Sequence, residues 1–233
     1  MLIIVDKKTP EEAKAKLRQW GELMEIETTG IVYPVISGHP DIFFNQVDDQ
    51  LVVAPNLLLK YFNILKSEKI NYQIGEIPVG KSYPETAKYN AVVTSKYLVH
   101  NTKITDTKIL KLCEGKKKIH VNQGYVRCNL IFLNDECAIT SDAGIAGELA
   151  GHSVDVLSVT TEGISLPGFK NGFFGGCCGV FRDKLFVLGS LDKYPDGERV
   201  RYFVGGTGFE IIELCNTELF DGGGVLFLDQ QLI

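Results

Sequence analysis

The sequence predicts an α/β fold, a five-bladed α/β propeller of ββαβ repeats around a pseudo-fivefold axis. A strand-turn-strand pattern that begins at His39-Pro40-Asp41 recurs along the chain. The residues equivalent to Asp41 are Asn90, Asn129, Cys178 and Gly223, at intervals of 49, 39, 49 and 45 residues. Self-similarity at this period is typical of repeat architectures, in which one unit cannot bury its apolar face alone. The fifth copy, GGVLFLDQQLI, is not followed by its second half, and a matching half stands at the start of the chain.

A helix and a short strand are expected after each hairpin. In the first unit Pro55 can open a helix, since its missing N–H is not needed there, and residues 72–77 read as the next strand. The next three units repeat this order, with helix caps at Thr105 or Asp106, at Ser141 or Asp142 and at Asp196, and strands at residues 119–121, 154–159 and 210–214.

The missing half of the fifth unit is predicted at the N-terminus. Residues 2–5 form a strand, Thr9 and Glu12 form a capping-box pattern, and residues 24–27 form the next strand. We expect the C-terminal strand to pair with the N-terminal one, closing a single domain over residues 1–233 and removing exposed sheet edges. The alternative is an ordinary α/β sheet with coincidental spacing, which does not explain the split fifth unit.

Composition excludes several classes of function. The net charge of −5 provides no basic face, so nucleic acid is not an expected partner. No apolar run approaches the roughly 20 residues of a membrane span, and the N-terminus lacks a signal peptide, so we expect a cytoplasmic protein. The six cysteines lack CxxC pairs or zinc-site spacing, which predicts reduced thiols, no metal and no cofactor. The oligomeric state cannot be predicted.

Polar residues at equivalent repeat positions are candidates for a ligand site. On a strand, His39 and Asp41 would face the same side, and Pro40 favours a strand start at a rim or bulge. Asp41 could instead cap its own turn. Asn90 and Asn129 occupy the Asp41 position, either as turn residues or as amides lining a channel. Arg127 and Asp221 occupy the His39 position, together with Lys88 and Gly176.

The stretch GFFGGCCGVF, residues 172–181, holds adjacent thiols. Cys177 or Cys178 could be an exposed nucleophile served by His39. They could equally be small apolar residues required where strands converge.

Two motifs resemble the pentein, or guanidino-group-modifying enzyme, superfamily. HPDIFFNQVDDQLVVAP is similar to the arginine deiminase segment that carries the catalytic histidine. The resemblance implies a general acid/base role for His39 and contact of Asp41 with a substrate guanidinium. GGGVLFLDQQ is similar to the last strand of agmatine deiminases, but their nucleophilic cysteine falls on Leu228 or within one residue of it. No cysteine follows Cys215, and leucine cannot attack a guanidinium carbon.

The whole chain also looks like a group of uncharacterised bacterial proteins of this fold, a likeness that implies no activity. The mixed charges at the repeat positions suit a small guanidino- or amino-acid-like ligand. The sequence therefore predicts a pentein-like binder without the usual nucleophile. The alternatives are a guanidine or amidine hydrolase, or an amidinotransferase-like enzyme, that uses Cys177 or Cys178 with His39, and a scaffold protein without a ligand.

Overall fold

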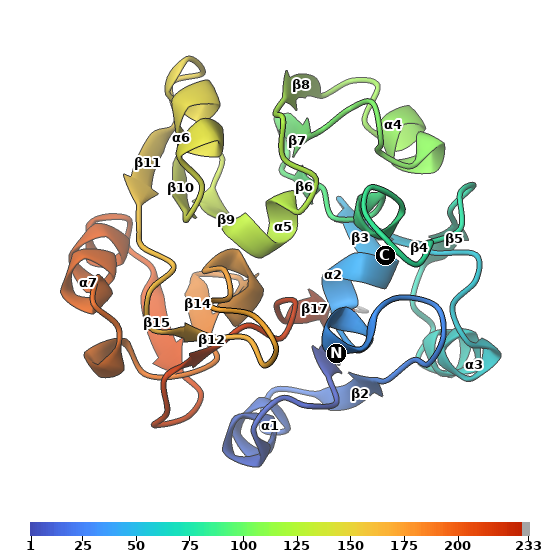
Figure 1. Ribbon diagram of the computed structural model, residues 1–233, viewed down its shortest axis with the longest axis horizontal. Coiled ribbons are helices and arrows are strands. Elements are labelled where there is room, and N and C mark those ends of the chain that lie inside the picture. The colour runs from blue at the N-terminus through green and yellow to red at the C-terminus, as the bar shows by residue number, and fades with distance from the viewer. Residues whose placement is uncertain (230–233) are drawn as a thin grey trace.

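The computed structural model describes residues 1–229, and in them five three-stranded sheets lie around a common centre (Figure 1). The sheets are β17-β1-β2 (Leu226–Leu228, Leu2–Asp6, Glu22–Ile26), β3-β4-β5 (Phe44–Val47, Gln50–Val53, Tyr72–Ile74), β6-β7-β8 (Val92–Val93, Tyr97–His100, Lys117–His120), β9-β10-β11 (Leu130–Asn134, Cys137–Thr140, Asp155–Ser158) and β13-β14-β15 (Cys178–Phe181, Lys184–Val187, Glu210–Glu213). An additional two-stranded sheet, β12 (Ile164–Ser165) with β16 (Leu219–Phe220), was not predicted.

The five sheets share one topology. The first two strands in each sheet are antiparallel, and the middle and third strands are parallel. A parallel pair needs a crossover, which a helix supplies in each sheet. These helices are α1 (Glu11–Leu17), α3 (Leu59–Ser67), α4 (Thr107–Leu112), α6 (Ala143–Ala150) and α7 (Gly197–Gly206), and they lie on the outside of the molecule (Figure 1).

The two ends of the described chain meet in one sheet. Strand β17 pairs antiparallel with β1, with Leu228 opposite Leu2 and Leu226 opposite Ile4. The sequence predicted this pairing of the terminal strands. The last residues of the fifth repeat copy, 230–233, lie outside the described residues.

Two helix starts differ from the prediction. Helix α3 begins at Leu59 rather than at Pro55. Pro10 takes the N-cap position of α1, one residue after Thr9, so the predicted capping box does not form and the Thr9 hydroxyl has no partner. Of the alternatives predicted at α4 and α6, Asp106 and Asp142 are the N-caps, and their side chains accept backbone N–H groups. Asp196 is the N-cap of α7 as predicted, but its side chain makes no capping hydrogen bond.

Short helical turns precede the first strands of four sheets. They are α2 (Pro40–Phe43), η2 (Glu85–Ala87), α5 (Val126–Asn129) and η3 (Gly175–Cys177); two further turns are η1 (Pro34–Ile36) and η4 (Leu191–Lys193). Helices α2 and α5 lie near the centre, inside the strands (Figure 1). Asp41 of α2 and Arg127 and Asn129 of α5 therefore belong to elements near the centre of the molecule.

Apolar packing joins neighbouring sheets. Phe227 of β17 contacts Phe186 of β14, with ring centroids 4.6 Å apart, and stacks on Phe181 of β13 at 5.4 Å. All five residues of β1 are buried. Of the helices in residues 1–229, none has the length and apolar character that a membrane crossing requires.

Candidate functional site

The His39-Pro40-Asp41 segment is a helical turn, and the predicted strand start is wrong. His39 is the N-cap of α2, Pro40 is its first residue, and β3 begins only at Phe44. Proline is favoured at this position because its fixed φ suits the helix and its missing N–H is not required. His39 and Asp41 consequently lie two residues apart on a helical turn, so the alternation of a strand does not place their side chains on one side.

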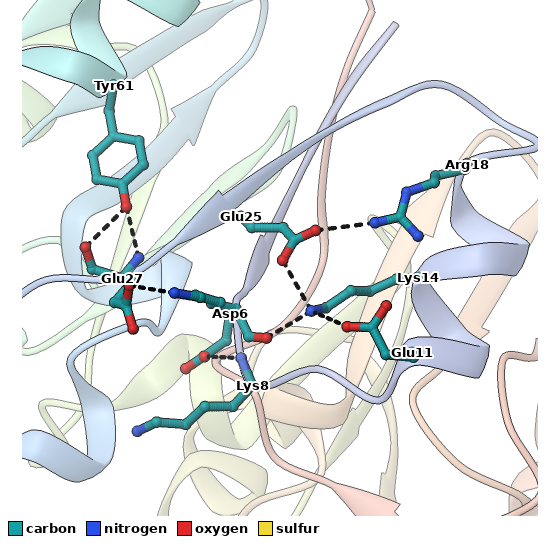
Figure 2. Close-up of polar contacts among 9 residues, drawn as sticks. Asp6, Lys8, Glu11, Lys14, Arg18, Glu25, Glu27 and Tyr61 are labelled. Carbon is teal, nitrogen blue, oxygen red and sulfur yellow. Dashed lines mark hydrogen bonds and ion pairs between the residues drawn. The ribbon is translucent and has the colours of Figure 1, made fainter.

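His39 is buried beside Asp6, the last residue of β1. Its Nε2 atom lies 3.9 Å from Asp6 Oδ2. Burial lowers the pKa of His39 to about 3, assisted by the Lys8 charge, and burial raises the pKa of Asp6 to about 6. The imidazole is therefore neutral at pH 7, and this contact is not an ion pair. Asp6 Oδ1 accepts the backbone N–H of Lys8 (Figure 2).

Asp41 contacts a cysteine that the sequence did not single out. The Cys128 thiol donates to Asp41 Oδ2 at 2.9 Å, and Asp41 Oδ1 has no partner. Burial raises the pKa of Asp41 to about 6. Burial and the Asp41 charge raise the pKa of Cys128 well above its usual value, so this thiol is protonated and is not an activated nucleophile.

Asn90 and Asn129 serve mainly to connect segments. Asn90 Oδ1 accepts the N–H of Arg127 at 2.7 Å and that of Cys128 at 3.2 Å, and Asn90 Nδ2 donates to the Asp41 carbonyl. Asn129 donates to the Tyr125 carbonyl and accepts the Ser141 hydroxyl. Both amides thus have protein partners on their oxygen and nitrogen atoms.

Asp221 is buried, and backbone segments pack closely against its carboxylate. Its carboxylate accepts the N–H of Phe173 at 2.9 Å and of Gly223 at 3.1 Å. Burial, followed by the nearby charge of Asp41, raises its pKa to about 7. A Cβ at Gly176 would lie 2.0 Å from Asp221 Oδ1, so Gly176 permits this approach.

The glycine run 222–224 has a similar function next to His39. Gly223 has a φ of +70°, which favours glycine, and a Cβ there would lie 2.4 Å from His39 Cβ. The glycines around the site therefore allow backbone to pack against Asp221 and His39.

Cys177 and Cys178 are both fully buried. Burial raises the pKa of Cys178 to about 12 and that of Cys177 well above its usual value. Cys177 donates to the Phe173 carbonyl and packs in the apolar core with Phe174 and Tyr194. An activated cysteine needs a lowered pKa. The catalytic role of these thiols stays a prediction, and their surroundings are those of packed, protonated groups.

Leu228, at the position where the resemblance places the nucleophile, is buried in β17. Its neighbours in the apolar core include Leu2, its partner in the sheet. In residues 1–229 no group of three or more His, Cys, Asp or Glu side chains is placed to hold a metal ion.

Some of the predicted site residues line cavities, and they line two different ones. The smaller, of about 170 Å³, brings His39 and Asp221 together. The larger, of about 450 Å³, is lined by Arg127 but not by those two residues. Neither of these two cavities is lined by the other predicted site residues, which are Asp41, Asn90, Asn129, Cys177 and Cys178. The smaller cavity is lined by Lys8, Pro34, Val35, His39, Leu166, Pro167, Phe220 and Asp221.

Sequence reasoning missed Lys8, Asn45 and Cys128. Asn45 lines the larger cavity with Arg127, and it carried one available signal, a polar residue within the apolar run IFFNQV. Lys8 and Cys128 gave no comparable signal, because their roles depend on segments far apart in the chain.

The fold is similar to the pentein fold of three solved structures. DDAH (dimethylarginine dimethylaminohydrolase) from Pseudomonas aeruginosa, in complex with citrulline, matches with a TM-score of 0.56 and 9% identity over 91% of each chain. Agmatine deiminase from C. jejuni has a TM-score of 0.54 and 12% identity, over 91% of this chain and 74% of that one. The amidinotransferase SxtG from Microseira wollei has a TM-score of 0.62 and 11% identity, over 100% of this chain and 95% of that one.

Sequence comparison assigns the particular family. Residues 4–226 match the profile described as Family of unknown function (DUF6873), and the chain belongs to this family. No curated protein matches the sequence. At these identities the structural likeness shows the fold alone.

Proposed function

We propose that the chain is a single-domain, five-bladed α/β propeller of the pentein type that binds a small guanidino- or amino-acid-like ligand and lacks the standard cysteine nucleophile. The common topology of the five sheets supports the architecture. The observation that carries the function is the smaller cavity, which combines buried Asp221, exposed Lys8 and apolar walls. A ligand with a cationic end, an aliphatic stem and a carboxylate matches this arrangement.

Asp221 is the proposed partner of the cationic end. Within residues 1–229, no lysine, arginine or histidine side chain lies within ion-pair distance of its carboxylate, which is held only by backbone N–H groups. A guanidinium or ammonium group in the cavity would stabilise the ionised carboxylate and oppose the effect of burial. His39 adds Nδ1, a buried ring nitrogen without a protein partner, which can pair with a further polar group of the ligand.

Lys8 is the proposed partner of the carboxylate end. Its Nζ atom donates to the carbonyls of Pro34 at 2.8 Å and Val35 at 3.3 Å. These acceptors are neutral, so the ammonium charge remains available to an anion. The aliphatic stem would pack on the apolar side chains between the two ends. These are Pro34, Val35, Leu166, Pro167 and Phe220.

Calorimetric titration with arginine and agmatine tests both ends of the site. The two molecules share the guanidinium and the aliphatic stem, and only arginine has the carboxylate. We expect Asp221→Asn to weaken both by at least about tenfold, because a charged partner is lost. Lys8→Met should weaken arginine and leave agmatine unchanged.

Lys7→Met is the matched control, because Lys7 pairs with Glu27 and does not line the cavity. It should bind both ligands like the wild type. The proposal fails if neither ligand binds, or if Asp221→Asn binds arginine as tightly as the wild type. Arginine should also be recovered unchanged after long incubation, whereas release of citrulline or ammonia would favour the enzymatic alternative with Cys177 or Cys178.

A further inference from the structure

The larger cavity lies against the first strands of all five sheets and is not used by the proposed guanidino site. At about 450 Å³ it is within the range of small-molecule sites. Much of its wall is apolar and includes Phe44, Leu130, Val180 and Phe227. Two polar side chains in this wall, Arg127 and Asn45, have unused hydrogen-bonding capacity.

Arg127 carries a charge that no nearby carboxylate neutralises. Its Nη1 donates to the Gly175 carbonyl at 2.7 Å and its Nη2 to the Cys178 carbonyl at 2.9 Å. Among the residues that the structure describes, no carboxylate lies within ion-pair distance of this guanidinium. From beyond ion-pair distance, the Arg127 charge lowers the pKa values of Asp41 and Asp221 and so opposes part of the effect of burial. The two carbonyls use two of its five N–H groups and fix its position, so a bidentate anion can still bind it.

Asn45 has a buried oxygen without a partner. The residue is 4% exposed, and its Nδ2 donates to the carbonyls of Tyr89 at 2.9 Å and Ala91 at 2.7 Å. Flipping the amide would place its oxygen against these two carbonyl oxygens, so the orientation is fixed. Oδ1 has no hydrogen-bond donor. A buried acceptor left unpaired is costly, and an N–H group of a ligand in the cavity would satisfy it.

Two carboxylates that line the cavity already have protein partners. Asp48 pairs with Lys116, and Asp135 accepts the Ser95 hydroxyl and the Lys96 backbone N–H. They do not compete with a ligand carboxylate for Arg127 at ion-pair distance. Arg127 and Asn45 thus offer a ligand one cationic donor and one neutral acceptor beside an apolar wall.

We propose that this cavity is a second ligand site, specific for an amino acid with an apolar side chain. The ligand carboxylate would bind Arg127, its ammonium group would donate to Asn45 Oδ1, and its side chain would pack against Phe44 and Phe227. The site is separate from the proposed guanidino site, because none of the residues that line the smaller cavity lines this one.

Titration with L-phenylalanine and two truncated analogues tests this assignment on the full chain. 3-Phenylpropanoate lacks the N–H donor and phenethylamine lacks the carboxylate. Each should bind at least about tenfold more weakly than L-phenylalanine, because each leaves a buried polar group or charge unpaired. Equal binding of all three would show that the cavity selects only apolar bulk and would overturn the proposal.

Two variants locate the binding site. Arg127→Met should reduce L-phenylalanine binding at least tenfold. Val180→Trp fills the cavity from its half-buried wall, leaves both polar groups intact and should also abolish binding, so it decides the matter if Arg127→Met does not fold. Lys8→Met should bind L-phenylalanine like the wild type, which separates this site from the guanidino site. Absence of L-phenylalanine binding, or full binding by Val180→Trp, would refute the second site whatever the result with arginine.

Discussion

Buried carboxyl groups without cationic partners distinguish the centre of this molecule at the scale of single residues. Burial raises the pKa of Asp6 and Asp41 to about 6 and that of Asp221 to about 7. Buried charges are normally paired. The buried ammonium group of Lys14, on α1, pairs with Glu11 and Glu25 and forms no ion pair with these three carboxyl groups (Figure 2). Asp221, which lines the smaller cavity, is therefore suited to receive a positive charge from a ligand.

Replacing Asp221 with asparagine should change the pH dependence of stability. Between pH 4 and 7 native Asp221 retains a proton that the unfolded chain has released, so this residue makes the wild type less stable as the pH rises. Asparagine does not titrate. The stability of Asp221→Asn relative to wild type should therefore rise from pH 4 to pH 8, by on the order of 3–4 kcal/mol. Urea unfolding at several pH values measures this difference.

Comparison with wild type cancels the titrations that both proteins share, including those of His39 and Asp6. Asp183→Asn removes an exposed carboxyl group and is the matched control; it should follow the wild-type profile. Asparagine loses one of the two backbone hydrogen bonds, which lowers stability at every pH and does not alter the slope. A difference that is constant from pH 4 to pH 8 would show that Asp221 is ionised throughout this range in the native protein.

Sequence patterns predicted which repeat positions contribute to the site, but they did not predict which side chains contact one another. His39 and Asp221 were found at the same repeat position, and they do share a cavity. The contact of Cys128 with Asp41 joins residues 87 positions apart, and no local pattern encodes it. Lys8 reaches its cavity because the turn after β1 packs against η1, which also depends on tertiary structure.

Short helical turns are the elements that position the site. The strand pattern predicted the hairpins β3-β4, β6-β7, β9-β10 and β13-β14, because alternating apolar residues leave a clear period. The turn over residues 40–43 escaped prediction because four residues are too few to show a helical period, and His39-Pro40-Asp41 fits both a strand start and a helix start. Asn90 connects two of these turns, since its side chain contacts the Asp41 carbonyl of α2 and the first N–H groups of α5.

Asn90→Ala should destabilise the protein by about 2–4 kcal/mol. The substitution leaves two buried N–H groups, those of Arg127 and Cys128, without an acceptor, and each unsatisfied group costs roughly 1–3 kcal/mol. Asn63→Ala, at an exposed position of α3, is the matched control and should change stability by less than about 0.5 kcal/mol. A loss below about 1 kcal/mol for Asn90→Ala would mean that other contacts hold α2 and α5 together.

The whole molecule depends on a sheet that combines both ends of the described chain. The repeat spacing predicted this arrangement, because a half unit at each end is sensible only if the ends meet. Every residue of β1 is buried, and β17 covers one edge of that strand. His39 lies beside Asp6 at the end of β1, Arg127 contacts Cys178 at the start of β13, and Asp221 directly follows β16. Ligand binding at the centre should consequently require that the terminal pairing is intact.

Deleting residues 225–233 tests this dependence. The deletion removes β17, exposes the backbone edge of β1 and removes Phe227 from its contacts with Phe181 and Phe186. Truncating a buried phenylalanine alone costs roughly 3–5 kcal/mol, and stability is commonly only 5–15 kcal/mol, so we expect the shortened chain to lose its cooperative thermal transition. A synthetic peptide of residues 225–233 should restore the transition by adding a strand to β1, whereas a scrambled peptide should not. A shortened chain that unfolds at the wild-type temperature would show that the terminal pairing does not hold the sheets together.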